Sequence, residues 1–151
     1  FVICSGAKSI LDLSKTNELL ETLGITRIGY QTNYMPGFWY EETENKVDNR
    51  FDEIHEISSF LKLNENIENK KSILIFNKVP LNKALNKNDV EKWINNAAIK
   101  ADRNNISGKE LTPFLIKEIN EESKNETLNA NTSLIINNAN LAGKIAKNFY
   151  S

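Results

Sequence analysis

The chain is poor in the residues that cross-link small secreted proteins and bind metals. Its 151 residues include one cysteine, Cys4, and one histidine, His55. A lone cysteine cannot form an internal disulfide, which favours a reducing compartment, either the cytoplasm or the lumen of a reducing organelle. His55 has no second histidine, cysteine or carboxylate at ligand spacing, so we expect a surface or boundary residue and no metal ligand. Cys4 is expected to be a small buried apolar residue.

The chain also lacks an excess of charge and any long apolar run. Its formal net charge is −1, and no basic patch of the kind that nucleic-acid binders use is visible. No apolar run approaches the roughly 18 residues that span a bilayer. No signal peptide is visible either, because Phe1 begins inside what reads as a buried strand. We therefore expect neither a nucleic-acid polymer nor a membrane as a partner.

The length and the 40% hydrophobic content predict a single domain over residues 1–151 that can bury a core. Domains seldom begin with a bare buried strand, so we expect the chain to be the second half of a longer protein.

Hydrophobic patterning predicts strands and helices in alternation. Strands are expected at residues 1–4, 26–30 and 72–76, with a short edge strand at 47–49. Helices are expected at 17–23 with Thr16 as the N-cap, at 51–63, around 90–101, from Thr112-Pro113 onward, and at about 128–149. The alternation predicts an α/β fold: a three-layer α/β/α sandwich around a mixed, mostly parallel sheet, with a helical C-terminal third.

Lys8 is the first candidate for chemistry. It follows the first predicted strand beside the glycine turn of Ser5-Gly6-Ala7, where open α/β sheets place ligands. A neutral lysine amine attacks sugar aldehydes to form a Schiff base, which requires a pKa lowered by burial or by nearby cations. Position alone favours the alternative, a solvated lysine that starts a helix.

Asn131 is the second candidate. In the last predicted helix it shares one face with Leu134, Asn138, Leu141 and Ile145, so it points inward near the amino end, where N–H groups favour anions. A buried amide needs partners, and a ligand is one option. A structural asparagine bonded to neighbouring backbone is the alternative that the residues alone favour.

Other polar and aromatic residues have simpler interpretations. Asn137 and Asn138 are expected to be packing or capping groups between helices. The loop aromatics Phe38, Trp39 and Tyr40 could stack on a base, but closing a core edge or a subunit interface is the favoured interpretation.

Several segments, in order, carry a resemblance to a known family. They read C-S-G-A-K-S-I-L-D-L, L-E-T-L-G, I-G-Y-Q-T, M-P-G-F-W, G-K-E-L-T-P-F and N-A-N-T-S-L-I-I-N-N-A-x-L-A. Together they resemble the pseudouridine-5′-phosphate glycosidase (indigoidine synthase A-like) family over essentially the whole chain. One departure is Asn77-Lys78-Val79-Pro80, where the family has an asparagine-proline-rich turn, so any contact made by Asn77 is in doubt.

The resemblance implies an α/β/α homotrimeric enzyme, a lyase or glycosidase of nucleotide catabolism. It would reversibly cleave the C–C glycosidic bond of pseudouridine 5′-phosphate to uracil and ribose 5-phosphate. Lys8 would attack C1′ of a ring-opened ribose to give a covalent Schiff-base adduct, and Asn131 would contact the sugar or the adduct.

The resemblance also implies parts that this chain does not carry. In the family, the general-acid glutamate, the aspartate that binds Mn²⁺ and most phosphate contacts lie upstream of the segment that matches Phe1. We therefore expect activity only when an N-terminal half is supplied, for example as a separate chain.

Two alternatives belong to other classes. One is a catalytically inactive structural or assembly subunit of the same fold. The other, a generic nucleotide-binding α/β module, is disfavoured because the chain has no G-x-G-x-x-G or P-loop sequence.

Overall fold

Short apolar segments form a parallel β-sheet. In the computed structural model, which describes residues 1–68 and 71–151, the strands are β1 (Val2–Cys4), β2 (Thr26–Tyr30), β3 (Asn49–Phe51) and β4 (Ile73–Phe76). Their order across the sheet is β1-β4-β2-β3. Every pairing in the described sheet is parallel, so the predicted α/β class is confirmed with a parallel sheet in place of a mixed one. Parallel neighbours require crossover connections, and those connections cover the faces of the sheet.

The predicted edge strand is displaced by two residues. It was expected at 47–49, but β3 pairs with β2 from Asn49 onward. The Asp48 carboxylate accepts the backbone N–H of Arg27 at 2.8 Å, while the Asp48 N–H donates to the Arg27 carbonyl at 2.9 Å. A side chain therefore takes the hydrogen bond that a strand backbone would have made, and regular pairing starts one residue later.

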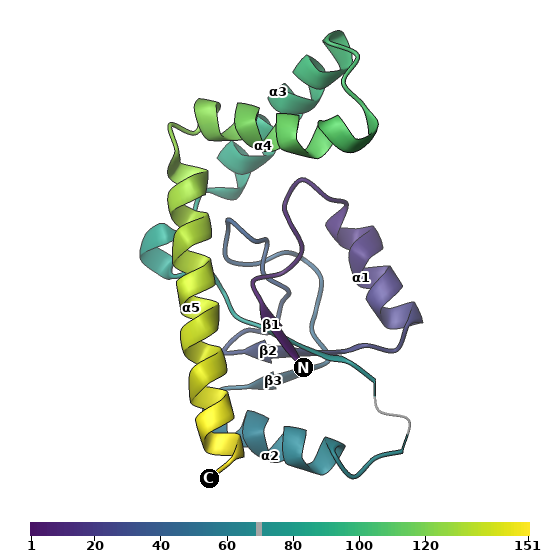
Figure 1. Ribbon diagram of the computed structural model, residues 1–151, viewed down its shortest axis with the longest axis vertical. Coiled ribbons are helices and arrows are strands. Elements are labelled where there is room, and N and C mark those ends of the chain that lie inside the picture. The colour runs from purple at the N-terminus through teal and green to yellow at the C-terminus, as the bar shows by residue number, and fades with distance from the viewer. Residues whose placement is uncertain (69–70) are drawn as a thin grey trace.

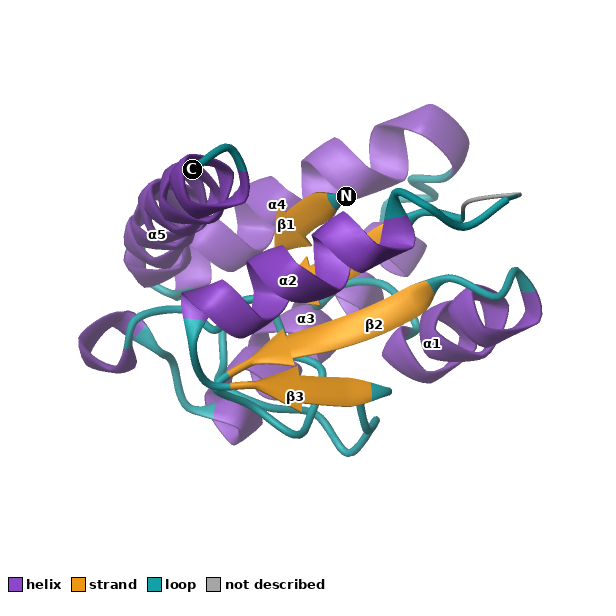
Figure 2. Cartoon of the chain, turned by 90° about the horizontal axis from the view of Figure 1, so that it is seen from below, coloured by secondary structure: helices purple, strands orange, loops and turns teal. Residues whose placement is uncertain are grey.

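The helices lie on both sides of the sheet. They are α1 (Leu13–Thr22), α2 (Ile54–Asn64), α3 (Lys87–Arg103), α4 (Leu111–Glu122) and α5 (Glu126–Phe149), with short 3₁₀ turns at Leu81–Lys83 and Gly108–Glu110. Figure 1 shows α1 above the strands and α2 below them, so helices lie on both faces of the sheet, as a three-layer sandwich requires. Helix α5 runs along the side toward which the arrows of β2 and β3 point in Figure 2. The predicted helical C-terminal third is confirmed by α3, α4 and α5.

Three predicted helix starts are wrong. The helix expected at 51–63 begins at Ile54, because Phe51 still pairs with β2 as the last residue of β3. The N-cap of α1 is Asp12, whose carboxylate accepts from the Lys15 N–H at 3.0 Å, whereas Thr16 lies in the first turn and donates its hydroxyl to the Asp12 carbonyl. Helix α4 begins at Leu111, because the 3₁₀ turn Gly108–Glu110 leads directly into it. Pro113 then lies in the first turn, where its missing N–H costs no helical hydrogen bond.

Two clusters of buried side chains make up the core. The first joins one face of the sheet to α2 and α5, and consists of Ile28, Ile57, Leu61, Ile73, Ile75, Leu141 and Ile145. The second joins α3, α4 and the start of α5 to the loop after β2, and includes Trp39, Tyr40, Val90, Ala97, Ala101, Leu115, Ile119 and Ala130. Trp39 is 2% and Tyr40 8% exposed. The prediction that the loop aromatics close a core edge is confirmed.

The lone cysteine and histidine differ in burial. His55 is exposed on α2, as predicted, whereas Cys4 is half-buried. Burial raises the pKa of the Cys4 thiol, and a hydrogen bond from the Gly6 backbone opposes that shift. No helix among residues 1–68 and 71–151 is long and apolar enough to cross a membrane.

A buried arginine ties α1 to the sheet. The side chain of Arg27, 7% exposed, pairs with Asp48 through Nη2 and with Glu21 through Nη1 at 2.7 Å. Its Nη1 also donates to Asn17 Oδ1 at 2.5 Å. Burial raises the pKa of Asp48, but the hydrogen bonds and charge of Arg27 outweigh it, so the pKa lies below its ordinary value.

Replacing Asp48 with asparagine should destabilise the fold by about 1–2 kcal/mol at neutral pH. This is less than the cost of breaking a fully buried pair, because the Asp48 side chain is 37% exposed and screened by water. A carboxyl group with a lowered pKa stabilises the fold above its unfolded pKa of about 3.9, and this stabilisation disappears as pH falls through the folded pKa. Urea unfolding should therefore show a difference in the free energy of unfolding between the natural chain and Asp48→Asn that is smaller near pH 3 than at pH 7.

Asp52→Asn is the matched control, since Asp52 pairs with Arg50 at the surface, 56% and 40% exposed. A loss of stability as large in the control as in Asp48→Asn would contradict the stabilising role of the Asp48–Arg27 pair.

Candidate active site

The carboxyl ends of β1 and β4 lie side by side and continue into polar residues. Cys4 and Phe76 are register partners, so Ser5 and Asn77 follow next to each other, and the Asn77 N–H donates to the Cys4 carbonyl at 2.9 Å. Ser5 is 2% and Asn77 6% exposed. This edge of a parallel sheet is where open α/β folds bind ligands.

Asn138 of α5 joins these two strand ends. Its Oδ1 accepts from Asn77 Nδ2 at 3.1 Å, and its Nδ2 donates to Ser5 Oγ at 3.1 Å. The neighbouring Asn137 donates from Nδ2 to the Lys78 carbonyl at 3.0 Å. The predicted role of Asn137 and Asn138 between helices is therefore wrong: both amides bond to residues that follow the strands. The doubt over Asn77 is also resolved, since its side chain contacts Asn138.

The turn that carries Lys8 is fixed against the loop after β2. Gly6 has φ +88, and a Cβ there would lie 2.0 Å from the Pro36 carbonyl oxygen. The Ser5 carbonyl accepts from the Phe38 N–H at 3.0 Å, and Ser9 Oγ donates to the Gly37 carbonyl at 2.6 Å. Lys8 therefore lies between two anchored residues on a turn whose path only glycine allows at position 6.

Lys8 itself is exposed. Its carbonyl accepts from the Leu11 N–H at 2.9 Å, and no ion pair within residues 1–68 and 71–151 includes its amine. The burial expected around this amine is thus not provided by the described residues. They bring the lysine to the carboxyl edge of the sheet and leave its side chain open to a further group.

Asn131, in the second turn of α5, is half-buried and faces the loop after β2. Its Oδ1 accepts from Trp39 Nε1 at 2.7 Å. The inward orientation that was predicted is confirmed, but the partner in this chain is a side chain and not neighbouring backbone.

The segment Gly37–Trp39 lies between the two candidate residues. Gly37 and Phe38 bond to the residues that flank Lys8, and Trp39 bonds to Asn131. Within the described part of the chain no hydrogen bond joins Lys8 directly to Asn131. The loop after β2 therefore supports both the turn that carries Lys8 and the Asn131 side chain.

The described residues do not fit a metal site. No group of three or more His, Cys, Asp or Glu side chains among residues 1–68 and 71–151 is arranged to hold an ion. The Mn²⁺ that the resemblance implies would therefore need ligands from outside the described residues.

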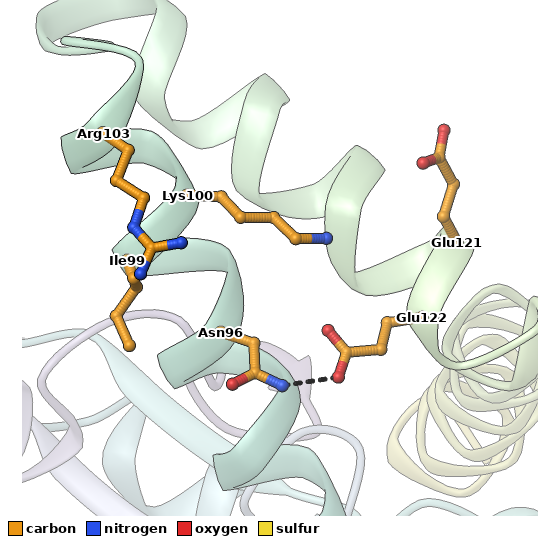
Figure 3. A pocket seen from close by; sticks show the side chains of 6 residues that line it. All are labelled: Asn96, Ile99, Lys100, Arg103, Glu121 and Glu122. Atoms are coloured by element: carbon orange, nitrogen blue, oxygen red, sulfur yellow. Dashed lines mark hydrogen bonds between the residues drawn. The ribbon is translucent and has the colours of Figure 1, made fainter.

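A cavity of about 550 Å³ lies away from these residues, between α3 and α4. Figure 3 shows its lining, Asn96, Ile99, Lys100, Arg103, Glu121 and Glu122, with Asn96 donating to Glu122 at 2.6 Å. Lys100 pairs with Glu118 at 2.8 Å, and this hydrogen bond raises the pKa of the lysine. The lining combines both signs of charge and includes neither candidate residue.

Comparison with known proteins places the chain in a family. A family model described as indigoidine synthase A like protein matches residues 1–148. The chain belongs to this family.

Curated relatives and solved structures agree with the family assignment. The pseudouridine-5′-phosphate glycosidase of Kosmotoga olearia is 44% identical over 145 residues, covering 96% of this chain and 50% of that protein. The Petrotoga mobilis protein of the same name is 43% identical over 148 residues, covering 98% and 48%. The chain thus spans about half the length of the curated relatives it matches.

Two solved members of the fold superpose closely on the chain. An indigoidine synthase A-like protein from Thermotoga maritima gives a TM-score of 0.84 at 33% identity, covering 95% of this chain and 47% of that one. The prealnumycin C-glycosynthase AlnA, in complex with ribulose 5-phosphate, gives 0.89 at 28% identity, covering 96% and 48%. The indigoidine synthase A-like fold is therefore reproduced over nearly all of this chain.

Proposed function

We propose that this chain is part of an enzyme that reversibly cleaves the C–C glycosidic bond of pseudouridine 5′-phosphate to uracil and ribose 5-phosphate, with Lys8 as the nucleophile. The names of the curated relatives and the sugar phosphate in the AlnA complex support a C-glycoside of a phosphorylated pentose as substrate. The observation that carries the proposal is the anchored turn that brings Lys8 to the carboxyl edge of the sheet.

The proposed chemistry uses the lysine twice. The ribose ring opens first: the C1′–O4′ bond breaks, O4′ takes a proton, uracil N1 gives one up, and C1′ becomes doubly bonded to C5. The neutral amine then adds to C1′ of this ring-opened ribose, so the C1′–N bond forms, the C1′=C5 bond becomes single, and one amine proton returns to uracil N1. The nitrogen lone pair then forms a C1′=N bond as the C1′–C5 bond breaks, and its electron pair stays on C5 of uracil, where a carboxylic acid delivers a proton. Water hydrolyses the resulting Schiff base, which releases ribose 5-phosphate and free Lys8.

Further parts of the proposed enzyme come from outside the described residues. The exposed Lys8 needs a group that excludes water from its amine, and the protonation step needs an acid. We propose that an N-terminal half supplies both, together with the Mn²⁺ site and most phosphate contacts that the resemblance implies.

Exposed apolar side chains support assembly with further protein. Ile135 and Ile136 of α5 are 63% and 57% exposed, and Phe1 and Val2 at the β1 edge of the sheet are 56% and 54% exposed. Apolar surface of this kind is typical of interfaces, and an edge strand is open to pairing. Completion by an N-terminal half and assembly into a homotrimer are both consistent with these surfaces.

Borohydride trapping tests the proposed nucleophile. Incubation of the complete natural polypeptide with ribose 5-phosphate and borohydride should reduce the Schiff base to a stable secondary amine on Lys8. Mass spectrometry of the peptide that contains Lys8 should show the mass of one reduced pentose phosphate, and Lys8→Ala should remove it.

The absence of an adduct, or an adduct that persists in Lys8→Ala, would remove the proposed mechanism. A polypeptide that gives no adduct but forms a stable complex with another chain of the same fold would favour the alternative, an inactive structural or assembly subunit.

A further inference from the structure

The hydrogen bond between Trp39 and Asn131 fixes which end of the amide is free. An indole N–H can only donate, so the Asn131 atom at 2.7 Å from Trp39 Nε1 must be the amide oxygen. The amide is planar, with its oxygen and nitrogen on opposite sides. Its Nδ2 hydrogens therefore point away from the indole.

The Asn131 Nδ2 group is available to a ligand. Within residues 1–68 and 71–151 no acceptor takes a hydrogen bond from it. No buried side-chain nitrogen or oxygen among these residues lacks a partner, so an unbonded Nδ2 on the half-buried Asn131 reaches the surface. The amide thus presents its donor hydrogens to the outside, while its oxygen is turned toward the indole.

The indole that sets this orientation is rigidly held. Trp39 is 2% exposed and packs in the second core cluster with residues of α3 and α4. The two residues before it, Gly37 and Phe38, bond to the turn that carries Lys8. A flip of the amide would turn Nδ2 toward the indole and leave the buried Trp39 N–H without its acceptor.

We propose that Trp39 is a positioning residue that makes Asn131 a hydrogen-bond donor toward the ligand. The group that Asn131 recognises is then an oxygen acceptor of the sugar phosphate, either a hydroxyl or a phosphate oxygen. This inference rests on the proposed function. It adds that Asn131 donates and does not accept in its contact with the ligand, and that Trp39 sets this orientation.

Variants of both partners separate a donor role from a structural one. Asn131→Asp keeps an oxygen for the indole and loses the NH₂ group, whereas Asn131→Ala loses both. Trp39→Phe keeps an aromatic ring and loses the N–H, so the amide is free to flip. Trp93→Phe is the matched control, because Trp93 packs half-buried against the same cluster.

The measurement is the affinity of the complete polypeptide for ribose 5-phosphate by calorimetry, with the Trp39 indole N–H resonance and thermal unfolding recorded alongside. Asn131→Asp and Asn131→Ala should each weaken binding by about 10- to 100-fold, the value of one hydrogen bond to a charged or strongly polar group. Asn131→Asp should keep the unfolding temperature and the hydrogen-bonded indole resonance. Trp39→Phe should weaken binding by about 10-fold, and Trp93→Phe should leave it unchanged.

Full affinity in Asn131→Asp with the indole bond intact would overturn the inference, as would an unchanged affinity in Trp39→Phe. A natural polypeptide that binds no ribose 5-phosphate would instead count against the proposed function, so the two failures are distinguishable.

Discussion

Replacing Lys8 with arginine should lower the rate of the proposed cleavage of pseudouridine 5′-phosphate by about 10³-fold or more, the scale of loss when a covalent nucleophile is removed. Arginine keeps the positive charge but does not deprotonate in proteins, so it cannot form the C1′–N bond. Because Lys8 is exposed, the free energy of unfolding should change by no more than about 0.5 kcal/mol. Steady-state kinetics of the complete polypeptide and urea unfolding measure the two effects.

Lys15→Arg is the control for this substitution. Lys15 is 82% exposed in the first turn of α1 and pairs with Asp12. Its replacement should leave both kinetics and stability unchanged. A Lys8→Arg variant that retains more than about a tenth of the activity would show that the amine is not the nucleophile.

Replacing Gly6 with alanine should produce the largest loss of stability, about 2–5 kcal/mol. One part of this cost is the left-handed backbone at φ +88, which is about 1–2 kcal/mol for a residue with a Cβ. The other part is the clash of that Cβ with the Pro36 carbonyl oxygen, 2.0 Å away, which only a backbone shift relieves. The shift would displace Lys8, so we also expect kcat to fall by about 10²-fold.

Gly108→Ala separates the two parts of that cost. Gly108 also has a positive φ, +59, but a Cβ there would meet nothing within 4 Å. Chemical denaturation should therefore show a loss of about 1–2 kcal/mol in Gly108→Ala and a clearly greater loss in Gly6→Ala. Equal losses would mean that the contact with Pro36 contributes nothing.

Elements with a strong local pattern could be predicted from the sequence. The continuous apolar run around Ile73–Phe76 and the helical spacing from Val90 to Ala101 each match one element, because burial imposes its own period on the side chains. Helix starts were harder, since Asp12 and Thr16 are both good N-cap residues. The choice depended on which side chain reached a free backbone N–H.

The candidate site shows the same limit. Local position and the resemblance point to Lys8 and Asn131, and the loop after β2 bonds to the turn that carries Lys8 and to the Asn131 side chain. Ser5, Asn77 and Asn138 were missed as a group because they are up to 133 positions apart and meet only in the folded chain. The exposure of Lys8 was also hidden from the sequence, because a buried strand before a residue does not fix where the next side chains point.

The short stretch from Gly37 to Trp39 bears on how this protein can tolerate change. Since it supports the lysine turn through one end and the asparagine helix through the other, adding or deleting a single residue there would shift two distant groups at once. Among functional relatives, natural variation should accordingly change which residues stand at these positions more readily than how many there are.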